Sequence, residues 1–498
     1  MKLLLKNVRQ ILAVLALTFT AFCTASNFPF KNPNPWKDDY SDISGMEHYK
    51  SWGTYNVHDP SCLKIGDTYY MYSTDAIFRE NRRKAAESNV PIGFIQVRTS
   101  KDLVHWNFVG WAFPEIPQEA TNWVLSHSNN KGAKNIWAPY IVQYKNKFRL
   151  YYCVSAFGLQ SSCIGLAESD SPLGPWIQKG SVVKTQVGDK MNAIDPTIIT
   201  DALTGKTWMY YGSFFGGLYV VELNPESGLT IVQNDQGKSI ARRANLKKDN
   251  IEAPEIIYNK ALKKYFLFMS YDPLMTTYNV RVGRSDKPEG PFTDYFGKDL
   301  RDTINHFPIL THPYKFDNQP GWAGTGHCSV FTNGKGDFFM AHQSRLSPDN
   351  QLMDMHIREV KWTAEGWPVV SPERYTSSKQ STIHKNELAG NWEIIRIQDS
   401  QTERKLEFGQ ILWGQNLLKQ SEINISKHIK LMSNGDLSQD MTGKWNFSAQ
   451  KGLTFILKDE TIKNLIVFIG HDWENETETI LFTGLDKSGR SVWGKKVR

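Results

Sequence analysis

Residues 66–72 read GDTYYMY, a Gly-Asp turn followed at once by aromatic and apolar residues, which is typical of a β-strand entered from a tight turn. The same order returns at intervals of about 60 to 80 residues. Its further copies are residues 146–152, 205–211, 263–268 and 336–341. Repeats of this length, each with room for several strands, favour the radial blades of a β-propeller over two packed sheets.

The repeat pattern ends in a polar stretch, residues 376–385, which is typical of a linker. Helical periodicity is scarce before it, apart from one short stretch over residues 81–88. Beyond the linker, apolar runs predict a small β-barrel or β-sandwich without chemistry of its own, over residues 390–397, 453–457, 465–469 and 492–494. We therefore expect an all-β chain, with a propeller domain over residues 26–380 and a C-terminal accessory domain over residues 381–498.

The N-terminus has the parts of a secretory signal: a basic start, an apolar run over residues 11–22 and small residues over 24–26. We expect a signal peptide over residues 1–25 and export to the periplasm or the extracellular space. The apolar run is too short for a membrane helix and no other run approaches about 20 residues, so no membrane span is expected. A lipid anchor at Cys23 stays open, although the bulky Phe22 before it does not suit a lipoprotein signal.

The formal net charge of +7 over 498 residues is a weak bias, and no long basic stripe accompanies it. Nucleic acid is therefore not an expected partner. We expect the densest basic cluster to lie on a solvated loop; it consists of Arg242, Arg243, Lys247 and Lys248.

The cysteines outside the signal lack CxxC spacing; they are Cys62, Cys153, Cys163 and Cys328. They predict neither a structural zinc site nor a disulfide scaffold, and most should be buried thiols. Spacing alone leaves a bridge between Cys153 and Cys163 open.

Three acidic residues stand between an apolar residue and a proline, just before a repeat strand. They are Asp59 in VHDPS (57–61), Asp195 in NAIDPT (192–197) and Glu252 in IEAPEI (251–256). Proline restrains the residue before it and removes a backbone donor, which holds the acid at a fixed angle where a strand starts. A single such motif would be a turn former, but three at equivalent places in different blades should point at one axial cavity.

Carboxyl groups on either side of a glycosidic bond are what glycoside hydrolysis requires. One is protonated and assists the leaving oxygen, and the other is ionised and activates a water or attacks directly. A third carboxylate can hold the acid in place and raise its pKa, because like charges close together disfavour double ionisation. The three motifs therefore favour a glycoside hydrolase.

With these motifs the chain resembles glycoside hydrolase family 43, whose members are five-bladed propellers that act on arabinans and xylans. It is most similar to the two-domain endo-1,5-α-L-arabinanases, whose accessory domain the C-terminal region also resembles. The likeness runs from about residue 52 to 375. Besides the three acid motifs, it rests on NIWAP (135–139), YGSFFGG (211–217), GTGH (324–327) and GWPVVSPERY (366–375).

The resemblance implies an inverting mechanism. Asp59 would be the general base on the water, Glu252 the general acid, and Asp195 the residue that orients Glu252 and tunes its pKa. An inverting pair stands about 6.5 to 9.5 Å apart, which leaves room for the water.

The resemblance also assigns a role to His327 in the GTGH stretch. A lone histidine is more often a packed or surface residue than a ligand. In this family the matching histidine helps to hold a metal ion, usually calcium, in the axial channel, mostly through water. Cys328 stands where the family often has asparagine, which changes the surroundings of such an ion.

Sugar recognition should use aromatic faces and a few polar groups. The resemblance places these residues in substrate-site stretches: His58, Trp137, Gly158, Asn192, Ser213, Phe214 and Phe215. Phe215 is often tryptophan in the family, which predicts weaker stacking at that position.

The sequence thus predicts a secreted, monomeric, calcium-containing enzyme that cleaves internal 1,5-α-L-arabinofuranosidic linkages of arabinan or arabino-oligosaccharides. Two alternatives stay open. The first is an exo-acting α-L-arabinofuranosidase or β-xylosidase of the same family, because loop shape decides between groove and pocket. The second is a non-catalytic glycan-binding propeller.

Overall fold

The computed structural model describes residues 50–75, 93–243, 250–302, 305–347, 353–399 and 418–497. The expected signal peptide, the lipid-anchor position Cys23 and the expected helix over residues 81–88 lie outside these ranges. Within them, no helix has the length and apolar composition needed to cross a membrane.

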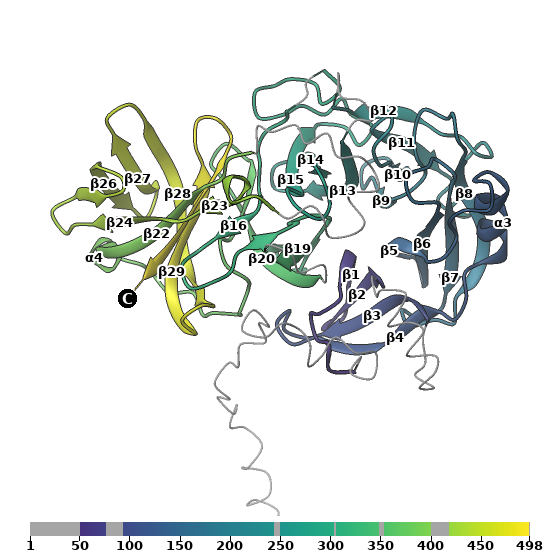
Figure 1. Cartoon of the computed structure of the whole chain (residues 1–498), viewed down its shortest axis with the longest axis horizontal. Helices are drawn as coiled ribbons and strands as arrows, with labels where there is room; N and C mark the ends of the chain where they lie inside the picture. The colour runs from purple at the N-terminus through teal and green to yellow at the C-terminus, as the bar shows by residue number, and fades with distance from the viewer. Residues whose placement is uncertain are drawn as a thin grey trace, which may run out of the picture. The chain divides into compact units, whose positions relative to one another are not determined.

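Open antiparallel sheets, arranged around a centre, form the region before the linker (Figure 1). The first sheet consists of β1 (His58–Ile65), β2 (Thr68–Thr74), β3 (Phe94–Ser100) and β4 (Asn107–Phe113). The second consists of β5 (Trp137–Tyr144), β6 (Lys147–Ser155), β7 (Ser162–Ser169) and β8 (Ile177–Thr185). The third consists of β9 (Thr197–Thr200), β10 (Thr207–Tyr211), β11 (Leu218–Leu223) and β12 (Lys238–Ala241).

The next sheet has three strands: β13 (Ile251–Asn259), β14 (Lys264–Tyr271) and β15 (Asn279–Ser285). The last blade consists of β18 (Cys328–Thr332), β19 (Phe338–Leu346), β20 (Asp354–Trp362) and β21 (Pro368–Val370). Short edge strands extend it: β16 (Tyr314–Lys315), β17 (Trp322–Ala323) and β23 (Asn424–Ile425).

The blade count differs from the expected five, because the described part of the chain has four complete four-stranded blades. Among the described residues, the sheet β13–β15 has no fourth strand. Between β15 and β16 the described chain pairs through isolated bridges, such as Arg284 with Thr293. Pro288 and Pro291 lie in this stretch, and neither has the N–H group that a strand ladder needs.

The aromatic runs that identify the repeat form the second strand of each sheet, namely β2, β6, β10, β14 and β19. Side chains alternate between the two faces of a sheet, so the large apolar ones fill the spaces between neighbouring sheets. Tyr72 and Tyr152 share one buried cluster, and Tyr210 and Tyr265 share another. The predicted all-β propeller is therefore confirmed.

The first strand of each sheet lies innermost, and hydrogen bonds join each inner strand to the next around a ring. The links are Ile141 N to Ser61 Oγ (3.1 Å), Tyr140 Oη to Ile198 O (3.1 Å), Thr197 Oγ1 to Glu255 Oε2 (3.0 Å), Val330 N to Glu255 Oε1 (2.8 Å) and Cys62 N to Ser329 Oγ (3.2 Å). Glu255 on β13 bonds both neighbouring inner strands, β9 and β18. Burial raises its pKa to about 7, against the hydrogen bonds that lower it.

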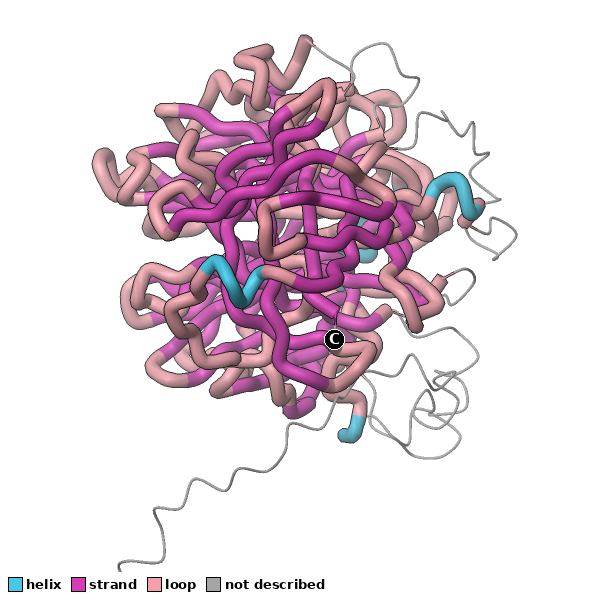
Figure 2. The backbone as a smooth tube through the Cα atoms, turned by 90° about the vertical axis from the view of Figure 1, so that its left-hand side faces the viewer, coloured by secondary structure: helices cyan, strands magenta, loops and turns pink. Residues whose placement is uncertain are grey.

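The chain after the linker forms a closed barrel of eight strands, which confirms the expected small β domain (Figure 2). Short helices α4 (Lys385–Leu388) and η3 (Gln420–Glu422) accompany it. Its interior is filled by apolar side chains that include Trp392, Leu465 and Phe482. The strands are β22 (Gly390–Arg396), β24 (Lys427–Leu431), β25 (Asp436–Gln439), β26 (Gly443–Ser448), β27 (Gly452–Leu457), β28 (Thr461–Asp472), β29 (Thr477–Leu485) and β30 (Ser491–Val497).

Two features of the propeller differ from the sequence-based expectations. Helix α3 (Gln118–Ser126) was not expected, because it buries only Ala120 and Val124 and so leaves a weak periodic pattern. Cys153 and Cys163 are free thiols, as are Cys62 and Cys328, so the bridge left open by spacing is not formed.

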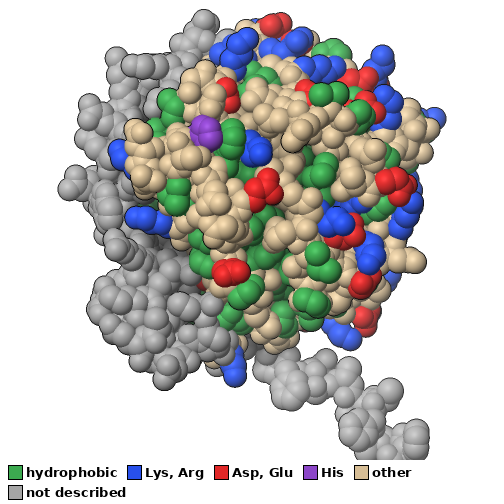
Figure 3. All heavy atoms as spheres, turned by 90° about the vertical axis from the view of Figure 1, so that its right-hand side faces the viewer, with side chains coloured by type: hydrophobic (Ala, Val, Ile, Leu, Met, Phe, Trp, Pro, Cys, Tyr) green, Lys and Arg blue, Asp and Glu red, His purple; other side chains and the backbone are tan. Residues whose placement is uncertain are grey.

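The expectation that the basic cluster lies on a solvated loop is wrong for Arg243. Arg243 is buried, and its guanidinium pairs at 2.5 Å with the carboxylate of Asp272, which directly follows β14. Arg242 is exposed, and Lys247 and Lys248 lie outside the described residues. On the face shown in Figure 3, basic and acidic side chains are interspersed.

We predict that Glu255→Gln flattens the pH dependence of stability. The native carboxyl is neutral below about pH 7, whereas the unfolded chain ionises it near 4.5. The contribution of Glu255 to the free energy of unfolding is therefore complete below about pH 4.5 and is lost as the pH rises through about 7. In urea denaturation, the variant should lose about 2 kcal/mol less than the wild type between pH 5 and pH 8.

The control is Glu226→Gln, whose carboxylate is exposed and should leave the pH dependence unchanged. Identical pH dependence of the Glu255→Gln variant and the wild type would contradict a protonated carboxyl in the ring.

Candidate active site

A shared backbone distortion marks the motifs that carry the acids. Bulges interrupt β1 between His58 and Ser61, β5 between Trp137 and Tyr140, and β13 between Glu252 and Glu255. The residue before proline is left-handed at each bulge and also before β9: φ is 49° at Asp59, 42° at Ala138, 58° at Asp195 and 55° at Ala253. A bulge re-aims side chains out of the regular alternation, and such strain of about 1–3 kcal/mol per residue is typical of functional sites.

Asp59 is the ionised member of the resulting cluster. Its Oδ1 lies 3.0 Å from Nε2 of His58 and 3.1 Å from Nδ1 of His327, and its Oδ2 accepts a hydrogen bond from the Thr74 hydroxyl at 2.8 Å. Burial disfavours the charge of Asp59, but the two imidazoles outweigh burial and hold its pKa well below the ordinary value. Burial lowers the pKa of His327, but the charge of Asp59 acts in the opposite direction and outweighs burial. The pKa of His327 is therefore raised to about 9.

Glu252 is shifted in the opposite direction. Burial raises its pKa above the ordinary value, and the charge of Asp59 adds to this effect. The Ser213 hydroxyl donates to Glu252 Oε2 at 2.7 Å, and the Tyr278 hydroxyl also bonds to the carboxyl; both bonds act against the rise. Glu252 is therefore suited to carry a proton.

Asp195 lies close to both. Burial raises its pKa well above the ordinary value; His327 opposes this rise, and Glu252 and Asp59 add to it. Its Oδ2 accepts a hydrogen bond from the N–H of Ala253, the residue next to Glu252, at 3.1 Å. The structure thus brings together the three acids, which lie in or next to the inner strands of three sheets; Asp59 and Asp195 are buried, and Glu252 is half-buried.

Four further residues belong to this cluster, and no motif marked them: Thr74, Tyr278, Gln343 and Arg345. Gln343 Oε1 accepts the N–H of Asp59 at 3.2 Å. Arg345 is buried; burial lowers its pKa to about 10, while the nearby charge of Asp59 acts against this. The only sequence signal was a polar residue inside or at the end of an apolar strand, which is too common to identify a site.

Trp137 and Gly158 lie on the β5–β7 side of the acids. Trp137 is half-buried at the bulge of β5, and the N–H of the next residue donates to Thr74 Oγ1 at 2.8 Å, the hydroxyl that also binds Asp59. The ring of Trp137 meets that of Phe157 edge-on, with centroids 6.3 Å apart. Gly158 follows Phe157 in the turn between β6 and β7. The bulge that carries Trp137 is thus linked to Asp59 through the Thr74 hydroxyl.

The other expected substrate residues follow β10 or precede β9. Phe214 and Phe215 are half-buried in the loop that contains Ser213, and both have left-handed backbones, with φ of 53° and 45°. The Ser213 hydroxyl ties this loop to Glu252. Asn192 is buried, and its Oδ1 accepts the Ser162 hydroxyl at 2.6 Å, a contact that belongs to the framework of the sheets.

His327 was expected to hold a metal ion. Its Nδ1 faces Asp59, and among the described residues no group of three closely spaced ligand atoms includes it. The His327 imidazole fits a hydrated ion that it would hold through water. Among the described residues it is not part of a cage of protein oxygens.

A group with metal-ligand spacing occurs elsewhere: oxygens of Glu373, Asp472 and Glu474 lie within 4.8 Å of one another. By distance alone these carboxylates could hold a metal ion, but an ammonium lies among them. Lys495 Nζ is 3.0 Å from Glu373 and 3.1 Å from Asp472, and it also pairs with Glu474. Burial would lower the pKa of Lys495, but the carboxylates raise it well above the ordinary value.

Comparison with known proteins agrees with this site. The sequence model of glycosyl hydrolases family 43 matches residues 53–368, and that of a C-terminal lipocalin-like domain matches residues 372–494. An extracellular endo-α-(1→5)-L-arabinanase of Thermotoga petrophila is 27% identical, over 89% of this chain and 93% of its own length. An extracellular exo-α-(1→5)-L-arabinofuranosidase of Cellvibrio japonicus is 33% identical, over 65% of this chain and 88% of its own.

Solved structures show the same likeness. The crystal structure of the endo-1,5-α-L-arabinanase from Thermotoga petrophila superposes with a TM-score of 0.73 at 26% identity, covering 90% of this chain and 99% of that one. Since the family model matches more than half of the residues, the chain belongs to glycosyl hydrolase family 43.

Proposed function

We propose that this glycoside hydrolase is an inverting endo-arabinanase, which cleaves internal 1,5-α-L-arabinofuranosidic linkages of arabinan. The observation that carries the proposal is a pair of opposite pKa shifts in one buried cluster, downward at Asp59 and upward at Glu252. Carboxyl groups whose surroundings push their pKa values apart are suited to act as base and acid in one reaction. A non-catalytic glycan-binding propeller would have no use for burying three carboxyl groups together at a cost in desolvation.

Asp59 accepts the proton of the attacking water. Its neighbours His58 and His327 keep it ionised, and the Thr74 hydroxyl fixes one of its oxygens, which leaves the carboxylate in one orientation. In an inverting mechanism the base and the acid act on opposite sides of the bond, and their carboxyl groups stand about 6.5–9.5 Å apart.

Glu252 donates its proton to the leaving glycosidic oxygen. Burial keeps the proton on this carboxyl, and the Ser213 hydroxyl orients it. Asp195 binds the N–H next to Glu252, which holds the acid in place, and its proximity disfavours ionisation of both groups together.

The sugar chain lies against the aromatic residues Trp137, Phe214 and Phe215. The other residues of the proposed sugar-binding set are His58, Gly158, Asn192 and Ser213. The Thermotoga relative, which aligns across both domains, supports endo action on arabinan. The Cellvibrio relative is an exo enzyme and is 33% identical, which favours exo action as the second candidate. Its alignment covers a smaller share of this chain, 65% against 89%.

We further propose that the chain is exported, as its relatives are extracellular. Its signal peptide spans residues 1–25. The alternative to free release is a lipid anchor at Cys23. The propeller domain then spans residues 26–380 and the accessory domain residues 381–498. Counting β13–β15 as a blade, with the Arg284–Thr293 bridge as the remnant of its outer strand, makes the propeller five-bladed. The enzyme acts as a monomer.

We also assign a hydrated calcium ion to the axial channel, with His327 as its ligand through water. When bound, such an ion adds positive charge that favours the ionised form of Asp59. The proton transfers themselves are carried out by Asp59 and Glu252.

On debranched arabinan, Asp59→Ala and Glu252→Ala should each lower kcat about 10³-fold, because each removes one proton-transfer group. Reducing-end release measures the rate. Separation of the products by size should show a ladder of oligosaccharides. NMR of the anomeric proton should show that the configuration of the new reducing ends is inverted. Glu226→Ala, at an exposed site, is the control. Near-normal hydrolysis by either variant would refute the assigned roles, and monomer as the sole early product would favour exo action.

Tyr278→Phe should move the alkaline limb of the kcat/KM profile to higher pH. The tyrosine hydroxyl bonds to Glu252 and acts against the upward pKa shift, so its loss raises the pKa further. Since the general acid must be protonated, activity then extends to more alkaline pH. Tyr265→Phe is the control, because its hydroxyl bonds to Asp201 at 2.6 Å. An unmoved alkaline limb would exclude Tyr278 as a neighbour of the working acid.

Elemental analysis of the purified enzyme should find calcium, and His327→Ala should lose it. Chelation of the wild type should lower activity, and added calcium should restore it. A chelated, metal-free enzyme with full activity would remove calcium from the proposal.

A further inference from the structure

The short segment that leads into Asp59 is held from two sides. Arg98 bonds the carbonyl groups of Gly53 and Tyr55, both at 2.7 Å. From the other side, the Thr54 hydroxyl donates to Asp354 Oδ1 at 2.7 Å, and the N–H of the next residue on β20 donates to Thr54 O at 3.0 Å. A shift of Thr54 would therefore move the start of β1 and the base that it carries.

Asp354 is a buried carboxyl group whose second oxygen lies near one cation, Arg374, and near the imidazole of His356, whose pKa burial holds well below the ordinary value. Arg374 Nη1 lies 3.6 Å from this oxygen and His356 Nε2 lies 3.7 Å from it. Burial raises the pKa of Asp354 to about 6, while Arg374 and the Thr54 hydroxyl act against this rise. The charge of Arg374 thus helps to keep Asp354 as a strong acceptor for Thr54.

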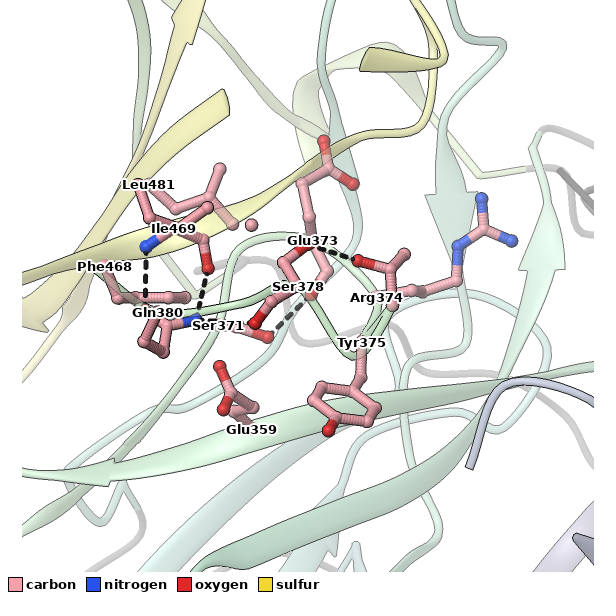
Figure 4. Close-up of a pocket in the computed structure, with 12 residues that line it drawn as sticks. Glu359, Ser371, Glu373, Arg374, Tyr375, Ser378, Gln380, Phe468, Ile469 and Leu481 are labelled. Carbon is pink, nitrogen blue, oxygen red and sulfur yellow. Dashed lines mark hydrogen bonds between the residues drawn. The ribbon is translucent and has the colours of Figure 1, made fainter. Parts of the chain in front are cut away.

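Arg374 is itself fixed by the barrel. Its guanidinium carbon lies 3.9 Å from the ring centroid of Trp473, and its carbonyl accepts the indole N–H of Trp473 at 2.9 Å. Trp473 directly follows β28, and on the propeller side the ring of Trp322 lies 5.4 Å from the guanidinium. Figure 4 shows the segment that contains Arg374 beside the side chains that β28 and β29 contribute to a small pocket.

We infer that Trp473, Arg374 and Asp354 form a relay through which the C-terminal barrel positions the general base. Trp473 fixes Arg374, Arg374 supports Asp354, and Asp354 holds the Thr54 hydroxyl on the segment that ends at Asp59. The inference rests on the proposed function, because it takes Asp59 as the base. Misplacement of a catalytic group by about 1 Å can cost about 10²-fold in rate, so the barrel acts in turnover without touching the sugar.

Other contacts across the same junction make a contrast. The buried Thr483 hydroxyl donates to Val370 O at 2.7 Å, and Lys495 pairs with Glu373 at 3.0 Å. Among the described residues, neither contact includes a residue of the 53–59 segment. These contacts hold the barrel against β21, and their loss should lower stability without a specific loss of kcat.

The experiment compares kcat and KM on debranched arabinan for Thr54→Val, Trp473→Ala and the double variant. Each single variant should lower kcat about tenfold and leave KM within about twofold, because the base and its neighbour His58 move while the aromatic sugar-binding residues stay. Thr54→Ser keeps the hydroxyl and should restore kcat. Because both changes break one relay, the double variant should be no slower than the slower single variant.

Matched controls separate positioning from loss of stability. Trp445 is as buried as Trp473, and its indole N–H donates to a carbonyl inside the barrel, Met432 O, at 2.8 Å. Trp445→Ala and Thr483→Val should lower the unfolding midpoint and keep kcat. All variants are assayed below their own midpoints, and Thr54→Val, which barely changes shape, provides the test should Trp473→Ala fail to fold.

A kcat of Thr54→Val equal to that of the wild type would overturn the relay, and so would losses that multiply in the double variant or an equal loss in Trp445→Ala. A wild type that releases no sugar from arabinan overturns the proposed function, which is a separate outcome because the relay is judged only against an active wild type.

Discussion

Closure of the inner strands into a ring is the constraint on which the rest of this structure depends. The strands belong to different sheets and diverge from one another, so backbone ladders cannot join them, and side chains such as Ser61, Thr197 and Glu255 supply the links. Closing the ring brings the starts of the inner strands to one axis. Left-handed residues before the prolines of the acid motifs then turn acidic side chains into the shared space, at a cost in backbone strain that the ring sustains.

The three acids occupy equivalent positions in the fold, but their electrostatic surroundings give them different pKa shifts. Burial disfavours the charge of each carboxyl, and the available positive partners are unequal. Asp59 has two imidazoles in contact and is ionised, whereas Glu252 has hydroxyl donors and Asp195 a backbone N–H. The pKa values of Asp59 and Glu252 are therefore shifted in opposite directions, which is the condition for the proposed hydrolysis.

The junction with the barrel follows the same rule that buried charge requires a partner. Lys495 neutralises carboxylates from both parts of the chain, and Arg374 lies between Asp354 and the ring of Trp473. Removing one partner of such a group leaves an uncompensated buried charge, which is far more costly than losing a surface pair. These contacts tie the barrel to the blade that also supports the segment before Asp59, and they link an accessory domain to the proposed site of chemistry.

The sequence by itself determined the repeated aromatic strands, the change of pattern at the linker and the three X-Pro acids. Each of these depends on local properties, namely turn residues, side-chain alternation and the effect of proline on the residue before it. Only the tertiary structure decided the missing outer strand after β15, the burial of Arg243 and the contacts of Tyr278 and Trp473 with residues distant in the chain. Which acid is ionised was also decided there, because pKa values depend on burial and on partners through space, and neither is written in sequence spacing.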